Sequence, residues 1–215
     1  LGRHAKAAGA DAVALVGPYY YRDRTVDEIV LHFEMVDREL QMPIFIYNNP
    51  EYQGYPIDID LYRRLLARAP GIFGAKLSQS PLPQALEYVR AFPDQRFFVV
   101  GSGMMPGMTQ GIRGFISPAL SLVPELAVEL VRAIDANDLD RANVLSERAA
   151  DATKLVVSMW KKHGRSPYAE GLRLLGLEFQ KYPRWPTPPL PEEDRLELVR
   201  VLRRARTSDL LVATA

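Results

Sequence analysis

The chain has 215 residues, 47% of them hydrophobic and 25% charged, as is typical of a globular protein. A formal net charge of +1 gives no indication of a nucleic-acid or membrane-surface partner. Because cysteine is absent, disulfides and thiolate metal sites are excluded, and a cytoplasmic location is favoured. The three histidines are far apart in the sequence, and no apolar run approaches the roughly 18 residues of a membrane span.

Apolar segments typical of buried strands alternate with amphipathic helices through the first part of the chain. A helix end in residues 1–8 stops at Gly9, because glycine commonly follows the last turn of a helix. The expected strands span residues 12–16, 43–47, 72–76, 97–100 and 114–117. The expected helices span residues 25–40, 58–68, 81–92 and 124–136, with a short one after residues 101–103. This alternation predicts a parallel sheet covered by helices, and a repeat of about 25 to 30 residues is typical of a (β/α)8 barrel.

Only helices are expected after residue 136. They span residues 138–163, 166–179 and 192–206, whereas the proline-rich residues 181–191 should be extended and residues 207–215 should fray. We therefore expect a partial (β/α) barrel in residues 1–136 and a C-terminal helical region in residues 137–215. Five strands are expected, whereas a closed barrel of this kind has eight.

Lys76 stands at the end of the third expected strand, where a charged side chain is unusual. Small apolar residues before it place its side chain among packed neighbours, and desolvation there disfavours the ammonium form. A neutral amine in a dry pocket attacks ketones, and the resulting Schiff base is an electron sink for aldol chemistry. The alternative interpretation is a lysine that extends from the strand end into solvent.

Further chemical groups follow the other expected strands. Tyr47 ends the second strand, Gly101 begins the turn after the fourth, and Ser117 ends the fifth. Taken singly, a tyrosine at a strand end often serves only for packing, and a Gly-Ser-Gly segment is often only a turn. Because the loops after parallel barrel strands meet at one mouth, these residues together predict a lysine nucleophile, a phenol proton donor and a cradle of backbone amides on one rim.

The order of four motifs resembles the dihydrodipicolinate synthase and N-acetylneuraminate lyase family of pyruvate-handling class I aldolases. The motifs are Pro18-Tyr19-Tyr20, Tyr47-Asn48-Asn49-Pro50, Gly74-Ala75-Lys76 and Gly114-Phe115-Ile116-Ser117. The resemblance runs from Gly9 to about Arg206. It implies a (β/α)8 TIM barrel, of which this chain supplies strands four to eight, followed by a C-terminal helical extension. It also implies a homo-oligomer, a dimer or tetramer, and we expect no cofactor and no metal ion.

Individual positions acquire roles from this resemblance. Lys76 is similar to the lysine that forms an imine with pyruvate or another 2-keto acid, and Tyr47 to the phenol that relays protons to and from the imine and the substrate oxygen. Tyr20 resembles the tyrosine that crosses a subunit interface to contact the neighbour's Tyr47. The backbone of Ile116 matches a position that lies against the bound keto acid. The expected substrate-binding residues are Ile116, Ser117 and Gly101.

Two features depart from the family pattern. The Gly-Thr-Thr segment that holds the substrate carboxylate lies on an early strand that the chain does not contain, so we expect an N-terminally truncated family member. Tyr52 stands where dihydrodipicolinate synthases carry an arginine for the carboxylate of the aldehyde substrate. Because tyrosine cannot make that bidentate charged contact, another aldehyde substrate is favoured.

The sequence thus predicts a Schiff-base lyase that condenses pyruvate or another 2-keto acid with an aldehyde, or cleaves the reverse adduct. The alternatives within this enzyme class are 4-hydroxy-tetrahydrodipicolinate synthase proper and an aldolase or dehydratase of 2-keto-3-deoxy sugar acids. A non-catalytic remnant of the family is the alternative from another class. A metal-dependent aldolase is disfavoured because no cluster of His, Asp and Glu occupies the strand ends.

Overall fold

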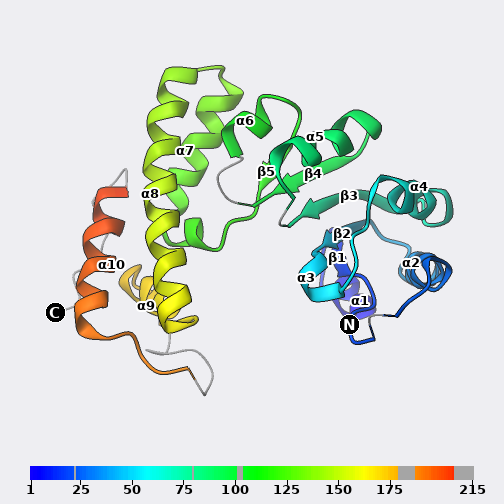
Figure 1. Cartoon of the computed structure of the whole chain (residues 1–215), viewed down its shortest axis with the longest axis horizontal. Helices are drawn as coiled ribbons and strands as arrows, with labels where there is room; N and C mark the ends of the chain where they lie inside the picture. Colours follow the sequence, from blue (N-terminus) through cyan, green and yellow to red (C-terminus); the bar gives the residue numbers. More distant parts are fainter. Residues whose placement is uncertain (22, 79, 101–103, 179–186, 206–215) are drawn as a thin grey trace. The chain divides into compact units, whose positions relative to one another are not determined.

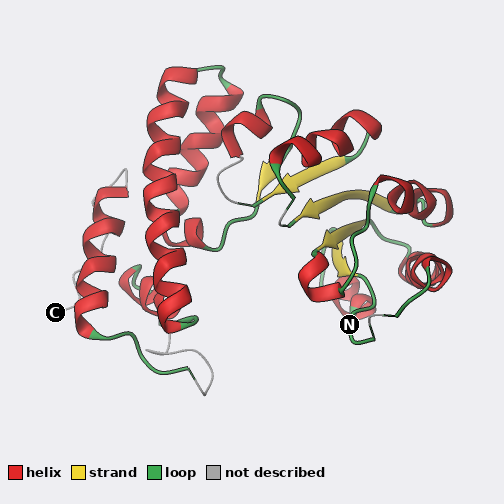
Figure 2. Ribbon diagram, viewed as in Figure 1, coloured by secondary structure: helices red, strands yellow, loops and turns green. Residues whose placement is uncertain are grey.

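The computed structural model describes residues 1–21, 23–78, 80–100, 104–178 and 187–205. The chain divides into two compact units, residues 1–116 and 117–215, which are described separately here. Figure 1 labels the elements along the chain, and Figure 2 separates helix from strand. The strands of the first unit are β1 (Val13–Val16), β2 (Ile44–Asn48), β3 (Ile72–Leu77), β4 (Arg96–Val99) and β5 (Gly114–Phe115). Its helices are α1 (Gly2–Ala7), α2 (Val26–Leu40), α3 (Pro50–Gln53), α4 (Ile59–Arg68), α5 (Leu82–Ala91) and α6 (Met104–Met108).

The five strands form one parallel sheet in the order β1-β2-β3-β4-β5. Each strand therefore pairs with its neighbour in the sequence, as in a (β/α)8 barrel. The expected alternation of strands and helices is confirmed, although β5 is shorter than predicted. The four-residue helix α3 was not predicted; it begins at Pro50, where the sequence indicated a loop.

Helices α2, α4 and α5 lie along one side of the sheet (Figure 2). The main core of the first unit lies between these helices and the strands. Phe33 of α2 and Leu65 of α4 are fully buried there, as is Ile46 of β2. Continuous burial on this side is what an apolar parallel strand requires, and it supplies most of the stabilisation of the sheet.

The opposite face of the sheet is lined by aromatic side chains. Phe45 contacts Phe73 and Phe98, with ring centres 5.4 and 5.2 Å apart, and all three are half-buried. Tyr47 and Lys76 lie on this same face, because they pair with one another in the register of β2 and β3. The face opposite the helices therefore carries both residues expected to be catalytic.

The register between β2 and β3 contains a bulge. Ile44 pairs with Ile72, whereas the next residue of β2, Phe45, pairs with Gly74. The extra residue is Phe73. A side chain at Gly74 has no room, because a Cβ atom there would lie 2.0 Å from the carbonyl oxygen of Arg96. The missing side chain thus permits β3 and β4 to approach at the bulge.

Helices α2 and α4 begin with capping residues, at the positions where the sequence predicted a helix start. Thr25 and Glu28 form a capping box at the start of α2, in which each side chain bonds the other residue's backbone N–H. Asp58 caps α4 by accepting a hydrogen bond from the backbone N–H of Leu61 at 2.9 Å. These bonds fix the start of each helix after its connecting loop.

The second unit is helical. It contains the 3-10 helix η2 (Ala119–Leu122), α7 (Pro124–Asp135), α8 (Leu139–His163), α9 (Ser166–Leu174) and α10 (Glu192–Ala205). Helices α7 and α10 both pack against α8 (Figure 1). Val156 and Met159 of α8 are buried in the core of this unit, whereas Trp160 is 40% exposed. The predicted domain boundary after residue 136 follows the β/α pattern and stays a prediction.

Candidate active site

Lys76 and Tyr47 are neighbours near the carboxyl ends of two adjacent strands. The Nζ atom of Lys76 lies 4.1 Å from the centre of the Tyr47 ring. Both side chains are half-buried, so the cation lies over an aromatic face without leaving water completely. The sequence predicted an amine and a phenol on one rim, and the structure brings these two together. The water exclusion expected around the amine stays a prediction.

The Tyr47 hydroxyl is held by a residue of its own loop. The side-chain amide of Asn49 donates a hydrogen bond to Oη of Tyr47 at 3.1 Å. The pKa of Tyr47 lies below its ordinary value of 10.0. Burial is the largest influence and raises the pKa, but the contributions of Asn49, Lys76 and Ser78 together outweigh it.

Ser78 adds a second hydroxyl beside the phenol. Its side chain is 5% exposed, and Oγ has no partner of good hydrogen-bond geometry among the described residues. It nevertheless lies close enough to Tyr47 to help lower the pKa of the phenol. Burying a hydroxyl without a hydrogen-bond partner costs free energy. The Ser78 hydroxyl can therefore still bind another polar group, such as one from a substrate.

Asn48 anchors the loop that carries these groups. Its side chain, 3% exposed, donates to the carbonyl of Ile57 and accepts from the backbone N–H of Ile57 and the amide of Gln53. Its own backbone carbonyl accepts from the N–H of Ser78 at 3.0 Å. The end of β2 is thereby tied to the loop before α4 and to the end of β3.

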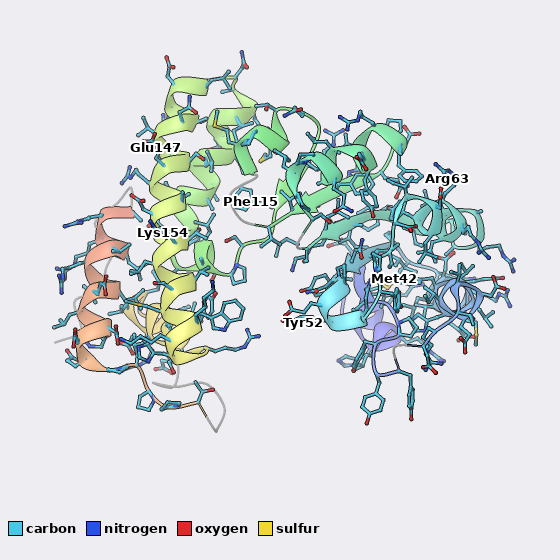
Figure 3. All side chains as sticks on the ribbon, in the orientation of Figure 1. Met42, Tyr52, Arg63, Phe115, Glu147 and Lys154 are labelled. Atoms are coloured by element: carbon cyan, nitrogen blue, oxygen red, sulfur yellow. The ribbon has the colours of Figure 1, made fainter. Side chains whose placement is uncertain are left out.

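Tyr52 stands at the edge of the site. It lies on α3, is 52% exposed, and is labelled in Figure 3. Its ring meets the Tyr47 ring edge-on, with centres 6.4 Å apart. The group that Tyr52 presents beside the phenol is therefore aromatic and uncharged.

A family model described as the dihydrodipicolinate synthetase family matches residues 1–205, nearly the whole chain. The chain belongs to this family. As the sequence resemblance implied, it is a member of a family of Schiff-base-forming lyases with the (β/α)8 barrel fold.

Two relatives are about one third identical to the chain over the residues that match. It is 32% identical over 207 residues to 4-hydroxy-tetrahydrodipicolinate synthase of Archaeoglobus fulgidus, covering 94% of the chain and 69% of that protein. It is 31% identical over 215 residues to the protein of the same name from Methanothrix thermoacetophila, covering 98% and 70%. The crystal structure of dihydrodipicolinate synthase from Aquifex aeolicus matches with a TM-score of 0.84 at 27% identity, covering 99% of the chain and 71% of that structure.

Of the four other residues expected from the family, the structure describes Tyr20, Ile116 and Ser117. Tyr20 follows β1, is 82% exposed, and meets Tyr21 edge-on with ring centres 5.0 Å apart. Ile116 is 42% exposed, and its backbone N–H is bonded to the carbonyl of Val99. Ser117 begins the second unit and is half-buried, and Gly101 lies outside the described residues. The roles of these four residues stay predictions.

Sequence reasoning missed the partner of the phenol in this family member. Asn49 was noted only as part of a motif, yet its amide is bonded to Tyr47. The Asn49-Pro50 dipeptide could have indicated it, because asparagine directly before proline is typical of a helix N-cap. An N-cap also fixes the direction of its side chain.

Neither a metal-binding cluster nor a membrane-spanning helix is found among the described residues. No group of three or more His, Cys, Asp and Glu side chains in this part of the chain is placed to hold a metal ion. No helix in the described ranges is both long and apolar enough to cross a membrane.

Proposed function

We propose that the chain is an aldolase that uses Lys76 as the nucleophile toward a 2-keto acid such as pyruvate, and Tyr47 as the proton carrier. The observation that carries this proposal is the 4.1 Å approach of the Lys76 amine to the Tyr47 ring on neighbouring strands. The family assignment supplies the reaction class, and the polar strand ends support the location.

The proposed condensation begins at the amine. The neutral Lys76 nitrogen adds to the keto carbon while the carbonyl oxygen takes up a proton, and the carbinolamine then loses water to give an iminium ion. Loss of a proton from the neighbouring carbon gives an enamine. The enamine carbon attacks the aldehyde carbon, and the aldehyde oxygen takes up a proton. Water finally hydrolyses the iminium and frees the amine; the same steps in reverse cleave the adduct.

Tyr47 serves the proton transfers in this scheme. A phenol can give a proton to the carbinolamine hydroxyl as it leaves, or to the aldehyde oxygen, and can later recover one. The lowered pKa of Tyr47 brings its two protonation forms closer together in free energy near neutral pH. Tyr47 is therefore better suited than an isolated tyrosine both to donate and to accept a proton.

The aldehyde partner is proposed from Tyr52. The relatives named above are synthases of 4-hydroxy-tetrahydrodipicolinate, but the exposed ring of Tyr52 offers no positive charge to an aldehyde that carries a carboxylate. We therefore favour a neutral or hydroxylated aldehyde, as in the aldol chemistry of 2-keto-3-deoxy sugar acids. The synthase reaction proper is the alternative, and a panel of aldehydes separates the two.

Trapping with borohydride tests the nucleophile. Incubation with pyruvate and borohydride should add the mass of one reduced adduct to the peptide that contains Lys76, and Lys76→Arg should abolish it. Lys6 is an internal control, because its Nζ is committed to the carbonyl oxygens of Leu40 and Gln41 at 2.8 and 2.9 Å. If no adduct forms on Lys76, the non-catalytic alternative is favoured instead.

Assembly and location belong to the same proposal. We propose a homo-oligomer, a dimer or tetramer, in which the exposed Tyr20 contacts Tyr47 of a second copy. Its test is the mass in solution of the chain and of Tyr20→Ala. The cytoplasmic compartment is proposed only from the cysteine-free composition.

A further inference from the structure

Asn49 makes two hydrogen bonds through the two ends of its side-chain amide. Its Oδ1 accepts from the backbone N–H of Tyr52 at 3.3 Å, which caps α3, and its Nδ2 donates to Oη of Tyr47 at 3.1 Å. The residue is only 5% exposed. A single buried side chain thus joins a helix start to the candidate proton carrier.

The cap determines which end of the amide faces the phenol. A backbone N–H can only donate, so the atom of Asn49 that meets it must be the oxygen. The nitrogen, which can only donate, is then left for Tyr47. The direction of the bond to the phenol therefore follows from the capping bond.

The bond has two consequences for the Tyr47 hydroxyl. A phenol oxygen carries one proton and acceptor lone pairs, so an N–H that occupies a lone pair leaves the O–H to point elsewhere. The nearest charged group acting on the phenol is Lys76, and the hydroxyl of Ser78 also faces it. In addition, a donated hydrogen bond is stronger when its acceptor is an anion, so it favours the phenolate form.

We propose that Asn49 is a positioning residue that aims the Tyr47 hydroxyl toward the Lys76 side and stabilises the phenolate. The contribution of Asn49 to catalysis rests on the aldolase function proposed above. In that function the charge of Lys76 is lost whenever the nitrogen is a neutral amine or an enamine. The Asn49 amide is uncharged and stays a donor throughout, so its support of the phenolate does not vary along the reaction. Lys76 alone provides no such constant support.

Two substitutions separate the donor from the cap. Asn49→Ser keeps an oxygen that can cap α3, but its hydroxyl is too short to replace the amide at the phenol. Asn49→Asp also keeps the cap, lacks an N–H donor, and places a negative charge beside the phenol. Both variants should fold, because serine and aspartate are as well suited to an N-cap as asparagine.

The phenol itself is the first measurement. Tyrosine labelled with carbon-13 at Cζ is followed by NMR as the pH rises in the unliganded chain, and the Tyr47 signal is assigned by its loss in Tyr47→Phe. The titration midpoint of Tyr47 should rise in Asn49→Ser and rise further in Asn49→Asp, while that of Tyr168, in the second unit, stays unchanged. If Asn49→Ser leaves the Tyr47 midpoint where it is in the parent chain, the proposal is wrong.

The second measurement is turnover. Asn49→Ser should lower kcat by about tenfold and move the basic limb of its pH profile upward, without preventing imine trapping on Lys76. Failure of trapping in the parent chain would remove the aldolase function but leave the NMR result valid. Normal turnover and an unchanged pH profile in Asn49→Ser would overturn the positioning role alone.

Discussion

The Lys76 amine lies 4.1 Å from the centre of the Tyr47 ring, and the two residues are direct partners in the register of adjacent strands. Backbone pairing, and not a flexible loop, therefore holds the proposed nucleophile beside the proposed proton carrier. A site built on strands holds its groups more accurately than one built on loops, so the proposed chemistry is sensitive to small changes in these strands.

Replacing the phenol should separate imine formation from turnover. Tyr47→Phe keeps the ring under the Lys76 amine but removes the hydroxyl, so we expect kcat to fall by about 100-fold or more. Trapping of pyruvate on Lys76 should persist, although more slowly. Steady-state kinetics and mass spectrometry measure the two effects. Tyr21→Phe, at an exposed tyrosine, should change neither.

An arginine on α3 should change the choice of aldehyde. Tyr52→Arg supplies a forked cation that can bind a carboxylate, so kcat/KM for an aldehyde with a carboxylate should rise about 10- to 100-fold relative to a neutral aldehyde. Tyr52→Phe is the matched control, because it keeps the ring and adds no charge. An unchanged ratio in Tyr52→Arg would show that this position does not face the aldehyde.

A methyl group at Gly74 should be severely destabilising. Its Cβ would lie 2.0 Å from the backbone oxygen of Arg96 and 2.7 Å from the ring of Phe45, and the backbone cannot easily give way. We expect Gly74→Ala to cost about 2 kcal/mol or more in the free energy of unfolding, measured with urea. At Gly107 the nearest atoms are side chains 3.2 Å away, so Gly107→Ala should cost much less.

Acid should weaken the second unit through Asp194. Burial raises the pKa of this carboxyl, but Lys162 and His163, 3.1 and 2.7 Å away, lower it below the ordinary value of 3.8. A carboxyl whose pKa is lowered by folding stabilises the fold above that ordinary value. The stabilisation is lost as the pH falls through the lower pKa of the folded state.

The matched comparison is Asp194→Asn. At neutral pH this variant should melt at a lower temperature than the parent chain, and the difference should shrink as the pH falls below 3.8. Asp60→Asn removes an exposed carboxylate paired with Arg63 and should show little of this behaviour. A constant difference between the parent chain and Asp194→Asn at every pH would contradict the assignment.

Local signals were sufficient for much of this fold. Helices were predicted to begin at residues 25 and 58, and the side chains of Thr25 and Asp58 cap those helices by bonding within one turn of the chain. The presence of Tyr47 and Lys76 on one rim also followed from the positions of two strand ends, because parallel strands place their ends on one edge; their direct pairing is added by the structure.

Contacts set by side-chain direction could not be predicted in this way. The bond from Asn49 to Tyr47 depends on the φ and ψ of a loop residue and on a cap made to a helix of four residues, which is too short to give a periodic pattern. The position of Ser78 beside the phenol likewise depends on the end of β3. The contact that we propose between Tyr20 and Tyr47 of a second copy is one that no single-chain pattern determines.

The bulge at Phe73 decides which way the lysine faces. Side chains alternate along a strand, so Ile72 and Lys76, four positions apart, belong on the same face of a regular strand. Ile72 is buried among the helices, whereas Lys76 reaches the opposite face, because one surplus residue between them reverses the parity. If Phe73 instead took a regular place in the ladder, the amine would point into the helix layer. For this strand, the bulge that accommodates Phe73 decides the side of the sheet on which the amine lies.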